Sequence, residues 1–177
     1  QAAETLSTMY NPSQSAFQEW LEYAEANADR PAGALRRAEL AVQQGDVALA
    51  KQLAEKAASF DRNNAHLLYD IAIMFARLGD LDGALRKISN AKLIDSSLGI
   101  LWFGEGLLYG EKGDTQRSIE AMEVAVEKDA GQDRWWYNLG VAYLQTGQSA
   151  KAKEVLRKAL SLNPEQPQYQ QALESVQ

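Results

Sequence analysis

The distribution of apolar and polar residues along the chain predicts α-helices throughout. Over most of the sequence, apolar residues recur three and four positions apart, which is the spacing of one face of an α-helix. These stretches come in pairs, and a glycine beside a polar residue separates the two members of each pair. The pattern therefore predicts a series of helix–turn–helix units.

Equivalent positions in successive units are separated by a constant number of residues. This repeat length is the number of residues from Gly45 to Gly79. Four columns of residues follow this step: Gly45, Gly79, Gly113 and Gly147; Ala57, Ala91, Ala125 and Ala159; Asp61, Asp95, Asp129 and Asn163; and Ala50, Ala84, Ser118 and Ala152. We expect each glycine to adopt the positive φ that ends a first helix, and the small residues to let two helices approach closely. The Asp or Asn residues can end the second helix or cap the next one.

The residues of the last unit carry a family resemblance. It contains Trp136, Leu139, Gly140, Tyr143, Ala152, Leu156, Ala159 and Pro164. This series resembles the tetratricopeptide-repeat (TPR) family, with Leu156 in place of the usual Phe. The third unit is similar from Trp102 to Ala125, but Glu105 stands where the family prefers Leu. A carboxylate on that packing side of a helix requires a partner, because a buried unpaired charge is costly.

The resemblance implies an all-α fold, an α-solenoid of TPR units that forms a right-handed superhelix, with the first helix of each unit lining the concave side. Successive units read 31–64, 65–98, 99–132 and 133–166. Residues 1–30 form an N-terminal segment, in which Asn11 and Pro12 start a helix at about 12–28 that covers the open end of the array or docks in a groove. Residues 167–177 predict a C-terminal capping helix with a polar outer face.

Composition narrows the range of functions. The net charge is −6, so the chain lacks the cationic excess that drives nucleic-acid binding, and we expect no nucleic-acid partner. No apolar run is long enough for a membrane span. The absence of Cys suits both cytoplasm and bacterial periplasm. The first residues, with neither an initiator Met nor a signal sequence, indicate a cleaved form or a piece of a longer protein.

The sequence offers little for catalysis. His66 is its single histidine, so no histidine pair for a metal and no nucleophile–histidine arrangement is available. The glycines 104, 106 and 110 lie in a helical pattern rather than after a strand, which argues against a phosphate loop. We therefore predict that the protein is not an enzyme, with no cofactor and no metal.

The resemblance also implies where a partner would bind. In this family the partner lies along the first helices, between the packing columns. The corresponding groove residues here are Leu35, Glu39, His66, Tyr69, Asp70, Ile73, Arg77, Phe103, Leu107, Glu111, Arg134, Tyr137, Asn138 and Val141. The middle of this set is apolar, which suits an amphipathic helix or an extended apolar peptide. Only Asn138 fits the carboxylate clamp by which some TPR proteins hold acidic chaperone tails.

The sequence thus predicts a scaffold or adaptor that binds another protein through a concave, largely apolar groove. Two alternatives stay open. The chain can instead self-associate into a homo-oligomer, because large apolar patches are seldom left uncovered. It can also be the TPR docking segment of a larger protein, such as an enzyme or a bacterial envelope assembly component.

Trp136 is expected in the core and its neighbour Trp135 on the surface, as a contact residue.

Overall fold

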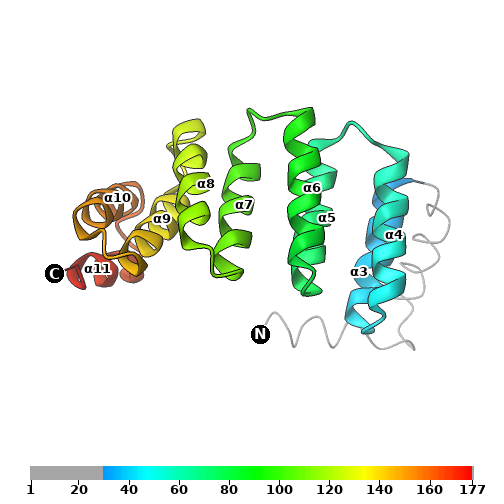
Figure 1. The fold of residues 1–177 in the computed structure, drawn as a ribbon, viewed down its shortest axis with the longest axis horizontal. Coiled ribbons are helices and arrows are strands. Elements are labelled where there is room, and N and C mark those ends of the chain that lie inside the picture. Colours follow the sequence, from blue (N-terminus) through cyan, green and yellow to red (C-terminus); the bar gives the residue numbers. More distant parts are fainter. Residues whose placement is uncertain (1–29, 177) are drawn as a thin grey trace. The chain divides into compact units, whose positions relative to one another are not determined.

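The computed structural model describes residues 30–176, and these residues form α-helices joined by short turns (Figure 1). The helices are α3 (Pro31–Gln43), α4 (Val47–Phe60), α5 (Ala65–Arg77), α6 (Leu81–Ile94), α7 (Gly99–Glu111), α8 (Thr115–Lys128), α9 (Asp133–Gln145), α10 (Ser149–Leu162) and α11 (Pro167–Glu174). No strand occurs among the described residues. The fold is therefore all-α, as predicted, while the helix expected at about 12–28 lies outside the described residues.

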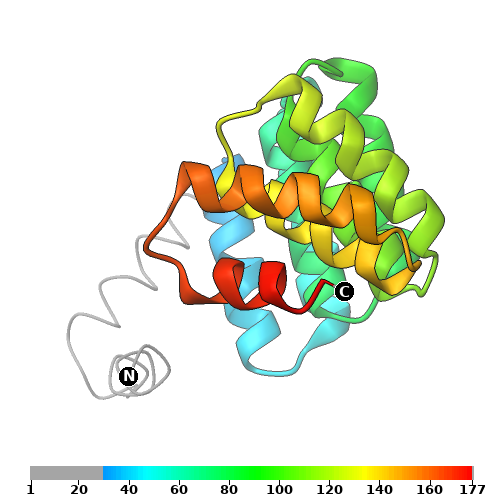
Figure 2. The ribbon, with the colours of Figure 1, turned by 90° about the vertical axis from the view of Figure 1, so that its left-hand side faces the viewer.

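The helices repeat with the same step that relates the glycines in the sequence. First helices start at positions 31, 65, 99 and 133, second helices start at 47, 81, 115 and 149, and α11 starts at 167. Each pair packs as a hairpin; α7 with α8 and α9 with α10 make the most extensive contacts in the C-terminal part. Figure 2 shows α9, α10 and α11 from the C-terminal end, with the short α11 beside the last hairpin.

The chain divides into two compact units, residues 1–67 and 68–177, with the division inside α5. In the first unit, the α3–α4 hairpin closes over small side chains, since Ala34, Ala38, Ala54 and Ala57 are fully buried. In the second unit, helices from α5 onward surround a core to which consecutive hairpins contribute. The residues discussed below belong to this second unit unless stated otherwise.

The turns inside the hairpins confirm the predicted role of the glycines. Gly45, Gly79, Gly113 and Gly147 have φ values between 72° and 79°, a left-handed conformation that a side chain disfavours. The following Asp caps the second helix in three hairpins: Asp46, Asp80 and Asp114 accept hydrogen bonds from backbone N–H groups at 2.8–3.2 Å. At the other end, the second helices stop at the column of Asp61, Asp95, Asp129 and Asn163.

Close helix packing explains the small-residue columns. Ala125 and Ala159 are fully buried, and at Gly140 an added Cβ would lie 2.6 Å from the Leu156 side chain. The core of the last two hairpins joins Ile119 and Met122 of α8 to Leu139 and Tyr143 of α9. The Tyr143 hydroxyl donates a hydrogen bond to the Glu123 carboxylate, which ties α9 to α8.

The prediction that Trp135 lies on the surface was wrong, whereas Trp136, expected in the core, packs against the core as a half-buried side chain. Trp135 is buried, 8% exposed, and its ring stacks on Phe103 with the centroids 5.2 Å apart. Trp136 is half-buried, and its Nε1 donates to the Ala130 carbonyl at 2.9 Å. One step of the repeat separates Trp135 from the buried Leu101 before it and from the buried Tyr169 after it, so its column packs against the preceding first helix. That column is visible in the sequence alone.

Glu105 has the partner that its position requires. Its Oε2 lies 2.6 Å from Lys92 Nζ, which reaches across from α6 of the preceding hairpin. The same ammonium lies 3.9 Å from the centre of the Trp102 ring. The pair therefore joins two hairpins, and it allows a carboxylate where the family prefers Leu.

Polar contacts hold α11 against the last hairpin. Tyr169 is 1% exposed, and its hydroxyl donates to Asp133 Oδ2 at 2.8 Å. Asn163 Nδ2 donates to the same oxygen at 3.0 Å. The Tyr169 ring also packs on Tyr137, with centroids 4.9 Å apart, so α11 contacts α9 much as a further first helix would.

No helix within residues 30–176 is long and apolar enough to cross a membrane.

Candidate functional site

All fourteen residues expected in the groove lie on first helices. Their distribution is Leu35 and Glu39 on α3; His66, Tyr69, Asp70, Ile73 and Arg77 on α5; Phe103, Leu107 and Glu111 on α7; and Arg134, Tyr137, Asn138 and Val141 on α9. Leu35, Glu39 and His66 belong to the first unit, where Leu35 is half-buried and the other two are exposed. The remaining residues belong to residues 68–177 and can be considered together.

Three aromatic side chains of this set link consecutive first helices. The Tyr69 ring lies against the backbone of α7, where an added Cβ at Gly104 would come within 2.9 Å of it. Phe103 stacks on Trp135 of α9, and Tyr137 packs on Tyr169 of α11. Burial, together with the nearby Asp70 carboxylate, raises the pKa of the Tyr69 hydroxyl. These rings are half-buried, so much of their surface serves the contacts between hairpins.

A second apolar column is more accessible. Ile73, Leu107 and Val141 stand four residues after the aromatic column, one on each of α5, α7 and α9. Leu107 is 40% exposed, and Ile73 and Val141 are half-buried. We call these three residues the first-helix strip. Large exposed aliphatic side chains lose water favourably when a partner covers them, so the strip is the best candidate for direct contact.

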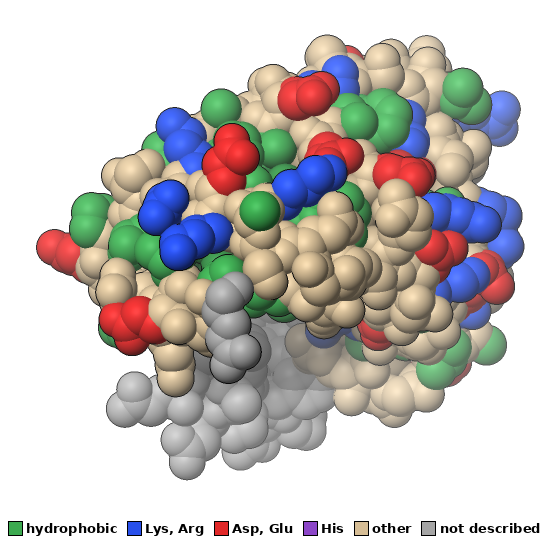
Figure 3. Space-filling model, turned by 60° about the vertical axis from the view of Figure 1, so that its left-hand side comes forward, with side chains coloured by type: hydrophobic (Ala, Val, Ile, Leu, Met, Phe, Trp, Pro, Cys, Tyr) green, Lys and Arg blue, Asp and Glu red, His purple; other side chains and the backbone are tan. Residues whose placement is uncertain are grey.

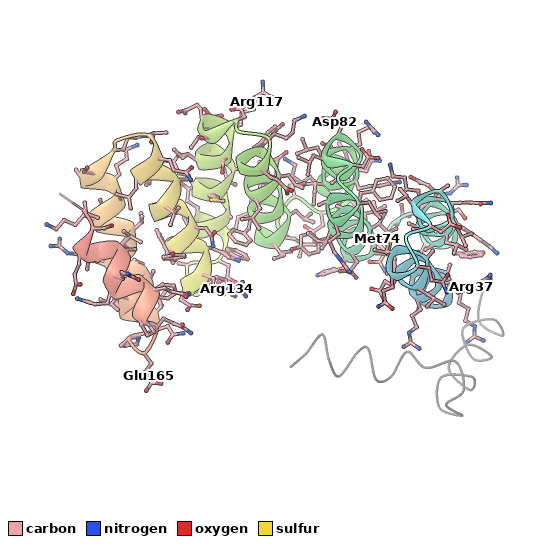
Figure 4. The ribbon with its side chains drawn as sticks, turned by 90° about the horizontal axis from the view of Figure 1, so that it is seen from below. Arg37, Met74, Asp82, Arg117, Arg134 and Glu165 are labelled. Atoms are coloured by element: carbon pink, nitrogen blue, oxygen red, sulfur yellow. The ribbon has the colours of Figure 1, made fainter. Side chains whose placement is uncertain are left out.

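Polar residues surround the strip with charges of both signs. Arg77 and Glu111 are exposed at the ends of α5 and α7, and Arg134 is exposed at the start of α9. Figure 4 shows Arg134 on the opposite side of this unit from Arg117 of α8, so the two kinds of helix present separate faces. Asn138 Nδ2 donates to the Arg134 carbonyl at 2.7 Å, which occupies part of its hydrogen-bonding capacity.

The strip is built for packing contact rather than for covalent chemistry. It presents aliphatic side chains, and its polar neighbours are single charges on successive helices. In the described part of the chain, no three His, Asp or Glu side chains come together as a metal site would require. The arrangement can bury an apolar surface and orient it through the flanking charges.

Comparison with protein families agrees with the repeat pattern. Two family models, each described as tetratricopeptide repeat, match residues 35–91 and 111–176. Together they extend over most of the helical region. A search of curated protein sequences gave no match.

Solved structures show the same fold at low sequence identity. The crystal structure of MamA is 19% identical, with a TM-score of 0.70 over 84% of this chain and 80% of that one. YrrB, described as a TPR protein with an unusual peptide-binding site, is 19% identical with a TM-score of 0.70, covering 97% of this chain and 86% of that one. The first TPR of Spaghetti (RPAP3) bound to the HSP90 peptide SRMEEVD is 16% identical, with a TM-score of 0.60, covering 63% and 91%.

The constant repeat step, the helical hairpins, the glycine turns and the two family matches agree with one another. The chain belongs to the tetratricopeptide-repeat family and folds as an all-α TPR solenoid.

Proposed function

We propose that the protein is an interaction scaffold that binds an apolar peptide or an amphipathic helix across its first helices, with the first-helix strip as the contact. The observation that carries this proposal is the exposure of Leu107, 40%, between the half-buried Ile73 and Val141 at the same register of neighbouring helices. An apolar column at one register supports a linear partner that crosses the helices.

The distance between packed helices favours a partner with a matching repeat. Adjacent helices pack about 8–10 Å apart. Seven residues of an α-helix rise about 10.5 Å, so apolar residues seven apart can each meet one member of the strip. One turn of polyproline II advances about 9.3 Å, so apolar residues three apart in an extended peptide meet the same requirement. These two geometries define the probes.

The energetics of the strip suit a moderate affinity. Burying three aliphatic side chains contributes roughly 1.5–3 kcal/mol each before the partner's ordering cost is subtracted. A micromolar complex requires about 8 kcal/mol, so the strip supplies a large share and the flanking charges and partly exposed aromatics supply the rest.

The family and the structural neighbours support the proposal in general terms. YrrB is described as having an unusual peptide-binding site, and the Spaghetti repeat is bound to a chaperone peptide. That peptide, SRMEEVD, is acidic, whereas the strip is aliphatic and Asn138 is already hydrogen-bonded to backbone. We therefore propose an apolar ligand for this chain.

A titration with designed peptides tests the function. One peptide is an amphipathic helix that carries Leu at every seventh position. The other is an extended peptide that carries Leu at every third position. Isothermal titration calorimetry should show micromolar binding of at least one peptide to the wild-type protein. Leu107→Glu should weaken it by about tenfold or more, because a carboxylate would be desolvated in the contact.

The matched control is Leu93→Glu on α6. Leu93 is 86% exposed on a second helix, so this variant introduces the same charge outside the strip and should bind as the wild type does. Equal affinity of the wild type and Leu107→Glu, with unchanged helicity, would remove the strip from the function. Light scattering separates self-association: a dimer that Leu107→Glu dissociates would show that a second copy covers the strip.

A further inference from the structure

A hollow lies on the second-helix side of the last hairpin. Its volume is about 780 Å³, and α10 supplies most of its lining. Trp136 and Val155 give it apolar surface, and Lys153, Glu154, Arg157 and Lys158 line it as well. None of these residues belongs to the first-helix strip, so the hollow is a separate surface.

The charge of α10 contrasts with that of the chain. Four cationic side chains and one anionic give this helix a net charge of +3, the most positive among the described helices, whereas the whole chain carries −6. Lys153, Arg157 and Lys158 form no ion pair or side-chain hydrogen bond with any described residue. Figure 3 shows Lys and Arg side chains set among apolar ones on the side of the molecule where α10 lies.

Trp136 differs from its equivalent in the preceding hairpin. Trp102 stands one repeat earlier and donates its Nε1 to a backbone carbonyl in the same way. The Trp102 ring, however, has Lys92 at 3.9 Å and Lys128 at 5.8 Å from its centre. For Trp136 the residue equivalent to Lys128 is Leu162, and no cation lies over its ring within residues 30–176. The Trp136 ring therefore lacks the cations that cover Trp102. It packs partly against the core and lines the hollow.

We propose that this hollow binds an acidic peptide segment that carries an apolar side chain. Carboxylates of the peptide would pair with Lys153, Arg157 and Lys158, and the apolar side chain would lie against Trp136 and Val155. Over a Debye length of about 8 Å at physiological salt, the local cations outweigh the distant negative charge of the chain. The cations thus favour an acidic segment, and the half-buried indole favours an apolar side chain within it.

Glu154 distinguishes a peptide from other anionic partners. A nucleic acid carries a phosphate at every nucleotide, so one of its phosphates would lie near the Glu154 carboxylate in the lining and be repelled by it. A peptide can place an N–H group or a neutral side chain beside it. A membrane surface is disfavoured as well, because interfacial binding requires apolar side chains that project outward, whereas the indole of Trp136 is half-buried and hydrogen-bonded.

Fluorescence anisotropy with the full chain tests the proposal. The probe is a labelled synthetic peptide with one Phe among Glu and Asp residues. It should bind the wild-type protein, more weakly as salt is raised, and the double variant Lys153→Gln, Arg157→Gln should weaken binding by about tenfold. The control is Arg62→Gln, Arg86→Gln, which removes two exposed cations outside the hollow and should leave binding unchanged. A probe with Ser in place of Phe should bind severalfold more weakly.

Several results would overturn the inference. These are an undetectable affinity of the acidic probe, the same loss in the control variant as in the α10 variant, or equal affinity of the Phe and Ser probes. Tighter binding of a single-stranded thymidine oligonucleotide or of phosphatidylserine vesicles would assign the hollow to a different partner. Leu107→Glu should leave the acidic probe bound, so the two surfaces can succeed or fail independently.

Discussion

At the level of single residues, Lys92 is informative because its side chain contacts two groups of α7. It neutralises the Glu105 carboxylate at 2.6 Å and covers the Trp102 ring at 3.9 Å. Both side chains of the pair are largely buried, with 18% and 12% of their surface exposed. A charge in that position depends on its partner, because burying an unpaired carboxylate carries a large desolvation cost.

We predict that Lys92→Met lowers the free energy of unfolding by about 1–3 kcal/mol, since it leaves Glu105 buried without its partner. The double variant Lys92→Met, Glu105→Leu should recover most of this loss, because an apolar pair replaces the ion pair. Urea unfolding of the four proteins of this cycle measures the effect. Additive losses in the double variant would mean that the two side chains are not coupled.

The Asp133–Tyr169 contact makes stability depend on pH at both ends of the scale. Burial alone would raise the pKa of the Asp133 carboxyl, but hydrogen bonds from Tyr169, Asn163 and backbone N–H groups lower it. Burial, aided by the hydrogen bond to Asp133, raises the pKa of Tyr169 to about 12. The carboxylate therefore stabilises the fold above its unfolded pKa and loses this effect below about pH 4; the phenol loses its effect as the pH rises above about 10.

Tyr169→Phe should reduce the free energy of unfolding by about 1–3 kcal/mol near pH 7, because it removes a hydrogen bond to a charged group. The difference from the wild type should shrink below about pH 4 and above about pH 10. Denaturant unfolding across this range tests both limits. Tyr137→Phe is the control, because the Tyr137 hydroxyl forms no hydrogen bond within the described residues. A difference that stays constant with pH would exclude the linkage.

At the level of the helices, the glycine turns set the boundary between the two members of each hairpin. Gly113 has a φ of 79°, and no atom lies within 4 Å of where its Cβ would be. A side chain at this position would therefore meet no steric clash with neighbouring residues. The positive φ of the backbone is what favours glycine here.

Gly113→Ala should cost about 1–2 kcal/mol, because an L-residue in the left-handed region is strained. Gly113→Asn should cost less, since Asn tolerates that region better than Ala. Thermal unfolding of the two variants gives the comparison. Equal stabilities of the Ala and Asn variants would show that the turn relaxes out of the left-handed conformation.

How well the sequence predicts each feature follows from the range of the interactions involved. The hairpins and turns are predictable because the helical period, the glycines and the capping Asp residues act within a few positions. The Lys92–Glu105 pair is predictable only in part: the need for a partner is visible at Glu105, but the partner lies on another helix. The burial of Trp135 was missed because it depends on stacking with Phe103 between hairpins, which only the column through Leu101 and Tyr169 indicates.

The candidate surface shows the same limit. Sequence places all fourteen residues on first helices but does not separate those that bind neighbouring helices from those left exposed. Tyr69, Phe103 and Tyr137 lean on the following first helix, whereas Leu107 does not and keeps 40% of its surface. Residues four apart lie on the same face of a helix, so their spacing does not separate the two columns. The columns differ because the aromatic rings contact the next first helix.

For the molecule as a whole, residues 68–177 present two faces with different chemistry. First helices carry the aliphatic strip, and the last second helix carries the unpaired cations around Trp136. We propose an apolar linear partner for the first face and an acidic segment for the second. One array can then hold two ligands at once, because no residue is shared between the surfaces.

Hydrogen exchange with and without the apolar probe tests the central claim, that a partner binds across the first helices. Binding should slow amide exchange in α5, α7 and α9 around Ile73, Leu107 and Val141, and leave α6, α8 and α10 unchanged. Protection confined to the second helices, or no change at saturating probe, would contradict the account.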